Sequence, residues 1–301
     1  MFILVLNASN IVQDGQNNKL VYNFPNSINF KDKYIAVSSV TMYYSWFNIA
    51  SNYQNNRFTY SWTSGGVTTV YTVNIPNGLY DISDINFYLQ YNFIRNGHYL
   101  VNASGENVYY AEMVVNANRY AIQINTNLVP TALPVGWSNP AGMVFPLQTF
   151  NPVITIPANF SNIIGYTAGF ATNNNVNNAY VPPTPSVSNN YVAKDALGNL
   201  SYLSNLAPNV QPNSSIFLSI SNINNPYSQP SSIIYSVTPT VSIGEQVIER
   251  PPNFMWNRMI DGTYNELRMT ILGIDKSPIQ LNDPNMTILL TIKDKDEIPT
   301  K

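Results

Sequence analysis

The chain has 301 residues, of which 45% are hydrophobic and only 10% are charged, with a formal net charge of −2. This length and apolar content are sufficient for a substantial hydrophobic core. The absence of Cys excludes disulfides, thiolate metal sites and Cys nucleophiles. The 14 basic residues are scattered along the chain, so we expect no direct contact with nucleic acid.

The first residues, "MFILVLNASN", form a short apolar run without a basic segment before it. This pattern predicts a first strand rather than a signal peptide. No apolar run approaches the roughly 20 residues that a membrane-spanning helix needs, so we expect no transmembrane segment.

Residues 33–49, "KYIAVSSVTMYYSWFNI", give the strongest strand signal, because they are rich in β-branched and aromatic residues. Both faces of this strand are apolar, so we expect both to be covered, either by the chain's own loops or by a neighbouring subunit. One face carries Ala36, Val40, Met42, Tyr44 and Trp46, and the other carries Ile35, Val37, Tyr43 and Phe47. The candidate subunit-interface residues are Tyr43, Tyr44, Trp46 and Phe47.

Two hairpins and several later strands follow. The first hairpin spans residues 58–75 and turns at Ser64-Gly65-Gly66, and the second spans 108–124 and turns at Asn116-Ala117-Asn118. Short strands with turn signals between them predict an antiparallel sandwich. The later strands are expected at 216–223, 233–237, 267–272 and 287–292.

A helix is predicted between the two hairpins, in "NGLYDISDINFYLQ". Asp81 can cap it, Asp84 favours its positive end, and Gly97 can terminate it. An apolar stripe on this helix comprises Ile85, Tyr88, Leu89 and Phe93. We expect the helix to connect two sheets and to seal an open edge of the core, as helices in jelly-roll connections do.

Residues 130–212 have a different composition. They include "ATNNNVNNAYVPPTPSVSNN", which predicts a long exposed loop or inserted module rather than core. A short helix, "ANFSNIIGY", precedes that stretch. The prediction is therefore a first part of a β-sandwich at 1–129, an insertion at 130–212, and the remainder of the sandwich at 213–301, ending in a charged solvated tail, "KDKDEIPTK".

Catalytic, cofactor-binding and metal-binding residues are not predicted. The single His, His98, follows the predicted helix end, where an exposed residue is expected. Asp294, Asp296 and Glu297 are interpreted as part of the charged tail rather than as a cation site. The four Trp residues are interpreted as core or interface residues rather than as platforms for sugars, and we expect no enzymatic activity.

Several stretches together resemble the minor capsid proteins of virophages and Polinton/Maverick elements, and most of all the virophage penton. They are "NIPNGLYDISDINFYLQ", "IPANFSNIIGYTAGF", "LSISNINNPYSQPSSIIYSVTP" and "LRMTILGIDKSPIQLNDPNMTILLTIKD". The resemblance implies an all-β chain with an antiparallel single jelly roll, one or two short helices in its connections and a long insertion. It further implies a homopentamer at each five-fold vertex of a virion, among trimers of a double jelly-roll major capsid protein. Such a protein is made in the host cytoplasm, and the family has no catalytic residues.

Two other functions remain open. A carbohydrate- or receptor-binding β module would show saturable sugar binding that depends on an exposed aromatic residue. A β-sandwich glycoside hydrolase or lyase would show turnover that depends on two facing carboxylates.

Overall fold

The computed structural model describes residues 1–172 and 200–297, and the chain divides into two compact units. The first unit comprises Met1–Phe47 and Pro212–Lys301, and the second comprises Asn48–Gln211. The second unit therefore begins at residue 48, well before residue 130, where the sequence analysis begins its insertion. The far boundary, at 211, differs from the predicted one by a single residue.

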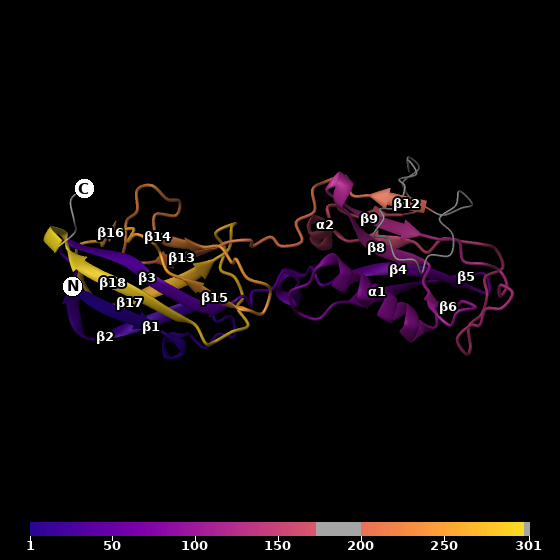
Figure 1. Ribbon diagram of the computed structural model, residues 1–301, viewed down its shortest axis with the longest axis horizontal. Coiled ribbons are helices and arrows are strands. Elements are labelled where there is room, and N and C mark those ends of the chain that lie inside the picture. The colour runs from indigo at the N-terminus through magenta and orange to yellow at the C-terminus, as the bar shows by residue number, and fades with distance from the viewer. Residues whose placement is uncertain (173–199, 298–301) are drawn as a thin grey trace. The chain divides into compact units, whose positions relative to one another are not determined.

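The first unit is a sandwich of two antiparallel sheets (Figure 1). One sheet has the order β1-β18-β3-β15, with β16 also paired to β3, and the other has the order β14-β13-β17-β2. Numbering its eight main strands along the chain gives orders of 1-8-3-6 and 5-4-7-2, which is the strand order of a jelly roll. The strands are β1 (Phe2–Leu6), β2 (Lys19–Asn29), β3 (Lys33–Tyr43), β13 (Ile216–Ile220), β14 (Ile233–Val237), β15 (Gln246–Glu249), β16 (Asn257–Arg258), β17 (Thr263–Leu272) and β18 (Thr287–Asp294).

A bulge in β3 explains why both of its faces look apolar in the sequence. β18 pairs Leu290 with Val37 but Leu289 with Ser39, so Ser38 is an extra residue on β3. The extra residue reverses which side the following side chains occupy. Ile35 and Val37 before the bulge, and Val40 and Met42 after it, thus enter the same core, although the sequence analysis placed these pairs on opposite faces.

The second unit contains two sheets, a two-stranded pair and both α-helices (Figure 1). Its sheets have the orders β11-β10-β4-β5 and β12-β9-β8, and β6 pairs with β7. The strands are β4 (Arg57–Ser64), β5 (Val67–Asn74), β6 (Leu100–Val101), β7 (Asn107–Val108), β8 (Ala111–Asn116), β9 (Ala121–Thr126), β10 (Ile154–Ile156), β11 (Phe170–Ala171) and β12 (Leu200–Leu203). Its described α-helices are α1 (Ile82–Asn96) and α2 (Ala158–Ile164). The 3-10 helices in the described parts of the chain are η1 (Ala8–Asn10), η2 (Ser51–Tyr53), η3 (Ala117–Arg119) and η4 (Lys295–Glu297).

Helix α1 belongs to the second unit and not to the jelly roll, which differs from its expected role as a lid on the sandwich. Asp81 accepts a hydrogen bond from the Asp84 backbone, and the Asp84 side chain accepts one from the Asp81 backbone. Gly97 ends the helix with φ 69°. The buried side of α1 packs into the aromatic core of the second unit through Ile82, Ile85, Leu89 and Phe93.

Part of the region predicted as an exposed insertion is core. Ile154 and Ile156 of β10, with Phe160 and Ile164 of α2, are fully buried in the second unit. The apolar residues of β10 and α2 occur in short runs between Pro and Asn residues, so the overall composition of the region did not indicate a core. Most of "ATNNNVNNAYVPPTPSVSNN" lies outside the described residues, because 173–199 are not described.

The two ends of the second unit are held together by one buried side chain. Asn48, at its start, donates through Nδ2 to the carbonyl oxygens of Val210 (2.6 Å) and Tyr80 (2.7 Å). Its Oδ1 accepts from the Tyr80 backbone at 2.9 Å. In the first unit, Trp46 Nε1 donates to the Asn213 carbonyl at 2.8 Å. Hydrogen bonds thus join the two ends of the second unit to each other, and Trp46 joins the two segments of the first unit on either side of residues 48–211.

The charged C-terminal segment is structured as far as residue 297, where the described part of the chain ends. β18 continues to Asp294, which forms an ion pair with Lys33 at 2.5 Å, and Glu297 contacts the N-terminal amine at 3.1 Å. Neither α1 nor α2, the two α-helices among residues 1–172 and 200–297, is long and apolar enough to cross a membrane.

We expect Gly165→Ala to destabilise the second unit more than Gly142→Ala. Both glycines have positive φ (73° and 81°), so each alanine costs about 1–2 kcal/mol of backbone strain. A Cβ at residue 165 would also lie 2.4 Å from the Leu206 carbonyl oxygen, whereas a Cβ at 142 meets nothing within 4 Å. This overlap adds roughly 1–3 kcal/mol. The measurement is denaturant unfolding of the full chain; equal losses for the two variants would contradict the packing at Gly165.

Candidate functional site

The candidate interface residues of the sequence analysis occupy two different environments. Tyr44 and Trp46 are buried in the first unit, 6% and 2% exposed, with ring centroids 4.3 Å apart. Phe47 is partly buried, and Tyr43 is 41% exposed on the outer side of β3. Tyr44 and Trp46 are therefore core residues, and Tyr43 is the member of the set that a partner can reach.

The outer face of the β1-β18-β3-β15 sheet carries apolar, hydroxyl and amide side chains over most of its length, and its charges lie at one end, where Lys293 and Arg258 both pair with Tyr34. Its most exposed side chains are Ile3, Val5, Tyr43 and Ile248. The outer face of the other sheet is charged: Lys19, Glu266 and Arg268 lie on it, and Arg268 Nε contacts Glu266 Oε1 at 2.6 Å. The jelly roll thus presents two chemically different outer faces.

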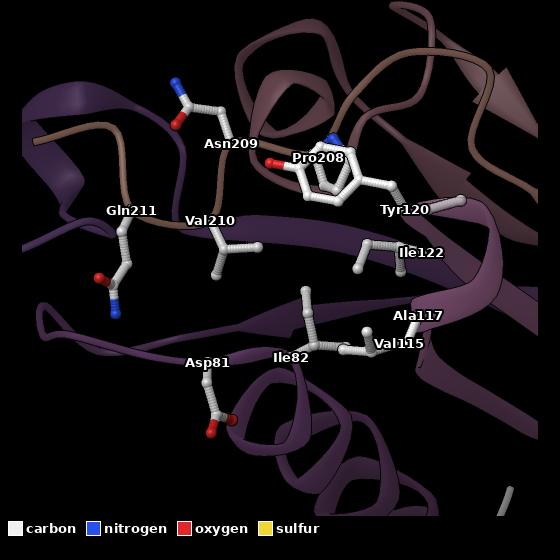
Figure 2. A pocket seen from close by; sticks show the side chains of 11 residues that line it. Asp81, Ile82, Val115, Ala117, Tyr120, Ile122, Pro208, Asn209, Val210 and Gln211 are labelled. Carbon is white, nitrogen blue, oxygen red and sulfur yellow. The ribbon is translucent and has the colours of Figure 1, made fainter. Parts of the chain in front are cut away.

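A groove in the second unit runs between the start of α1, the β8–β9 connection and residues 208–211. Its volume is about 540 Å³. Ile82, Ile122 and Val210 point into it, as Figure 2 shows. Tyr120 lines one side, and the side chains of Asp81, Asn209 and Gln211 lie around the opening (Figure 2). The groove is therefore apolar at its base with a few polar groups at its margin, which is typical of small-ligand sites.

Tyr120 is presented to solvent by an unusual backbone conformation. It is 74% exposed, and its φ of 48° is in the left-handed region that large side chains rarely adopt. It follows η3 at the β8–β9 turn, which the sequence analysis predicts from Asn116-Ala117-Asn118. The turn was predictable from the sequence, but the exposure of the ring beside residues 208–211 was not, because those residues lie far away in the chain.

A second exposed apolar group lies along the outer side of α1. Phe87, Tyr91 and Ile94 are 63%, 58% and 43% exposed. Their spacing of four and three residues places them on one stripe, on the side of the helix away from Ile85 and Leu89. The sequence analysis identified only the buried stripe of this helix.

His98 is buried, although the sequence analysis expected an exposed residue. It is 5% exposed, its Nδ1 lies 3.0 Å from the Tyr60 hydroxyl, and its ring stacks on Trp62 with centroids 4.5 Å apart. Burial lowers the pKa of His98 to about 4, because the charged imidazolium would be desolvated. The aromatic residues of β4 that enclose it are distant in the sequence, so local pattern gave no sign of them.

Two carboxylates of the C-terminal segment, Asp294 and Glu297, form ion pairs with Lys33 and the N-terminal amine. The hydrogen bond from Lys33 lowers the pKa of Asp294, and the N-terminal amine has the same effect on Glu297. Over residues 1–172 and 200–297, no group of three or more His, Asp or Glu side chains is arranged to hold a metal ion.

Comparison with known proteins identifies similar solved structures, among them two virophage structures. A crystal structure of the mavirus penton protein matches with 9% identity over 96% of this chain and 97% of that chain, with a TM-score of 0.41. A structure of the Sputnik virophage matches with 11% identity over 98% of this chain and 99% of that chain, with a TM-score of 0.38. No protein-family model and no curated protein matches the chain. Since both TM-scores are low, the jelly-roll assignment rests on the strand order described above.

We expect the stability of the second unit to fall between pH 7.5 and pH 5. The folded-state pKa of His98 lies below its ordinary value of 6.5, so the unfolded chain takes up the proton first. The stabilisation by neutral His98 is complete above about pH 6.5 and is lost as the pH falls towards 4. At pH 5 the free energy of unfolding is lower by about 2 kcal/mol.

The measurement is denaturant unfolding of the full chain at several pH values, with His98→Gln as the control. Glutamine does not titrate, so this variant should lose most of the pH dependence in this window. The carboxylates with a lowered pKa, such as Asp294, titrate below pH 5 and therefore outside this window. An unchanged slope in the variant would contradict a neutral, buried His98.

Proposed function

We propose that this chain is a structural protein of an icosahedral virion. It is a penton, five copies of which form a ring at each five-fold vertex among trimers of a double jelly-roll major capsid protein. It is made in the host cytoplasm and functions in the capsid, without catalysis or a cofactor. The observation that carries the proposal is the strand order of the first unit, 1-8-3-6 and 5-4-7-2.

The jelly roll occurs in viral capsid proteins, lectins and cupins. Cupins and other ligand-binding barrels hold their ligands in a hollow interior. The interior of this sandwich is instead filled by large apolar side chains, among them Leu6, Leu20 and Phe30, which are fully buried. A filled interior leaves the outer faces as the functional surfaces, which supports an assembly role.

The composition of the chain supports the same role. Only 16 acidic and 14 basic residues are present among 301, so copies of the chain repel one another little. Charged residues are also depleted at the centres of protein interfaces. A head-to-tail contact between two different faces closes into a ring when the rotation permits, and five nearly neutral copies can form such a ring.

We expect the purified chain to form a pentamer whose association changes little between about 0.05 and 1 M salt, since few charges are available for screening. Sedimentation and native mass measurements across protein and salt concentrations test this. Monomer under all conditions would contradict self-sufficient assembly.

A second function, receptor or carbohydrate binding by the second unit, is favoured by the groove at Tyr120. An exposed aromatic ring offers a stacking surface for the apolar face of a sugar, and Asn209 and Gln211 are polar residues that line the same groove. This function is compatible with the first, because a vertex protein can carry a binding unit.

We expect Tyr120→Ala to reduce any saturable glycan binding by roughly fivefold or more, since stacking of a sugar on one aromatic ring is worth on the order of 1 kcal/mol or more. Tyr91→Ala is the matched control, because Tyr91 is also exposed but does not line the groove. A glycan array provides the measurement. Equal binding by the two variants, or no binding by the parent chain, would contradict this second function.

A further inference from the structure

Four cross-strand rows on the outer face of the β1-β18-β3-β15 sheet contain no charged residue. Residues directly opposite each other in antiparallel strands project to the same side, so the pairing defines the rows. They are Ile3–Thr291–Ala36, Val5–Leu289–Ser39, Thr287–Thr41–Ile248, and Tyr43–Gln246. Every member is apolar, a hydroxyl residue or an amide. Charge appears only beyond the rows: Lys293 pairs with Tyr34 at one end, and Asp283 accepts a hydrogen bond from the Tyr43 backbone at the other.

Part of this face is already covered by the chain. Ala36 and Thr291 are buried, 0% and 2% exposed, and Ser38 contacts Thr291 through their hydroxyls. The remaining rows are open, and Ile3 and Ile248 are more than half exposed (58% and 57%). The open rows therefore expose apolar side chains among hydroxyl and amide groups, with charge only at the margin, and depletion of charge is typical of interface centres.

The size of the face fits the centre of a protein interface. Strands about 4.8 Å apart and rows about 6.8 Å apart give four strands and four rows an area of roughly 500 Å². That area is near the upper end of the apolar patches that monomers expose. One partner of a standard interface buries about 800 Å², so this face can supply the centre while neighbouring loops supply the rim.

The chemistry of the face selects its partner. A charged surface placed on it would lose water without gaining an opposite charge, which is costly. Nucleic acid and anionic membranes are therefore poor partners, and an uncharged protein surface is a good one. A second copy of this chain offers such surfaces, because only one residue in ten is charged. The charged outer face of the other sheet, with Lys19, Glu266 and Arg268, lacks this property.

We propose that the outer face of the β1-β18-β3-β15 sheet is a self-association surface that packs against a second copy of this chain. This inference rests on the proposed function, since it identifies one of the faces that close the ring. It retains Tyr43 from the predicted interface set and replaces the buried Tyr44 and Trp46 with Ile3, Val5, Leu289 and Ile248.

The first test introduces a charge into the face. Ile248→Lys and Ile3→Lys should each weaken association at least roughly tenfold, because each copy then buries an unpaired ammonium. Val70→Lys is the matched control: Val70 is 66% exposed on β5 of the second unit, and this variant should assemble like the parent chain. Native mass measurements give the association state, and circular dichroism establishes that each variant is folded.

The second test uses the absence of Cys, which makes any introduced thiol unique. Maleimide labelling of Ile248→Cys should be slowed at least roughly tenfold when the protein is concentrated enough to assemble. The thiol is then covered by the second copy and can be labelled only after the copies dissociate. Labelling of Val70→Cys should stay the same. Ile248→Cys removes little volume, so this test remains informative if the lysine variants fail to fold.

The outcomes separate the two proposals. If the parent chain forms pentamers and the Ile248 variants assemble and label like the controls, the surface is wrong and the proposed function stands. If the parent chain forms only dimers that Ile248→Lys dissolves, the surface is right and the pentamer is wrong. If the parent chain is monomeric under all conditions, a second copy is not the partner, and the surface and self-sufficient assembly are both wrong.

Discussion

The pairing of strands from opposite ends of the chain is the constraint on which the rest of the structure depends. β1, at residues 2–6, pairs with β18, at residues 287–294, and β18 pairs with β3. The jelly roll can form only when these distant segments meet, which makes the pairing costly in chain entropy. The cost is reduced because residues 48–211 form a unit of their own, whose ends are joined by Asn48 and Val210. An insertion with adjacent ends lets β3 and β13 occupy the same sandwich.

This arrangement separates two tasks along one chain. The jelly roll supplies two outer sheet faces that differ in charge, one with four uncharged rows and one with Lys19, Glu266 and Arg268. The second unit supplies a groove, an exposed Tyr120 and an apolar stripe on α1. Its ends are held by hydrogen bonds of its own residues, so its surface can vary without disturbing the strand pairing of the sandwich.

The sequence predicted those features that depend on local chemistry. The hairpin at 58–75, the strand at 233–237 and the capping of α1 by Asp81, Asp84 and Gly97 follow from turn residues, alternation and capping preferences. The all-β antiparallel class also followed from them. β2 and β15 were not predicted, because Pro25 and Asn residues interrupt the first and the second is only four residues long.

Features that depend on distant residues were not predictable. The bulge at Ser38 became visible only through the pairing of β3 with β18, so the apolar residues of 33–49 suggested two covered faces. The burial of His98 depends on Tyr60 and Trp62 of β4, and the boundaries of the second unit depend on contacts between its two ends. The exposed position of Tyr43 beside Ile3 and Ile248 was likewise not predictable, because strands from distant parts of the chain bring these residues onto one face.

Negative-stain electron microscopy of the purified full-length chain tests the central claim most directly. If this protein works by tiling around an axis through its jelly-roll faces, class averages will show closed rings with five-fold symmetry. Isolated particles of one copy, or open chains without closure, would contradict that account.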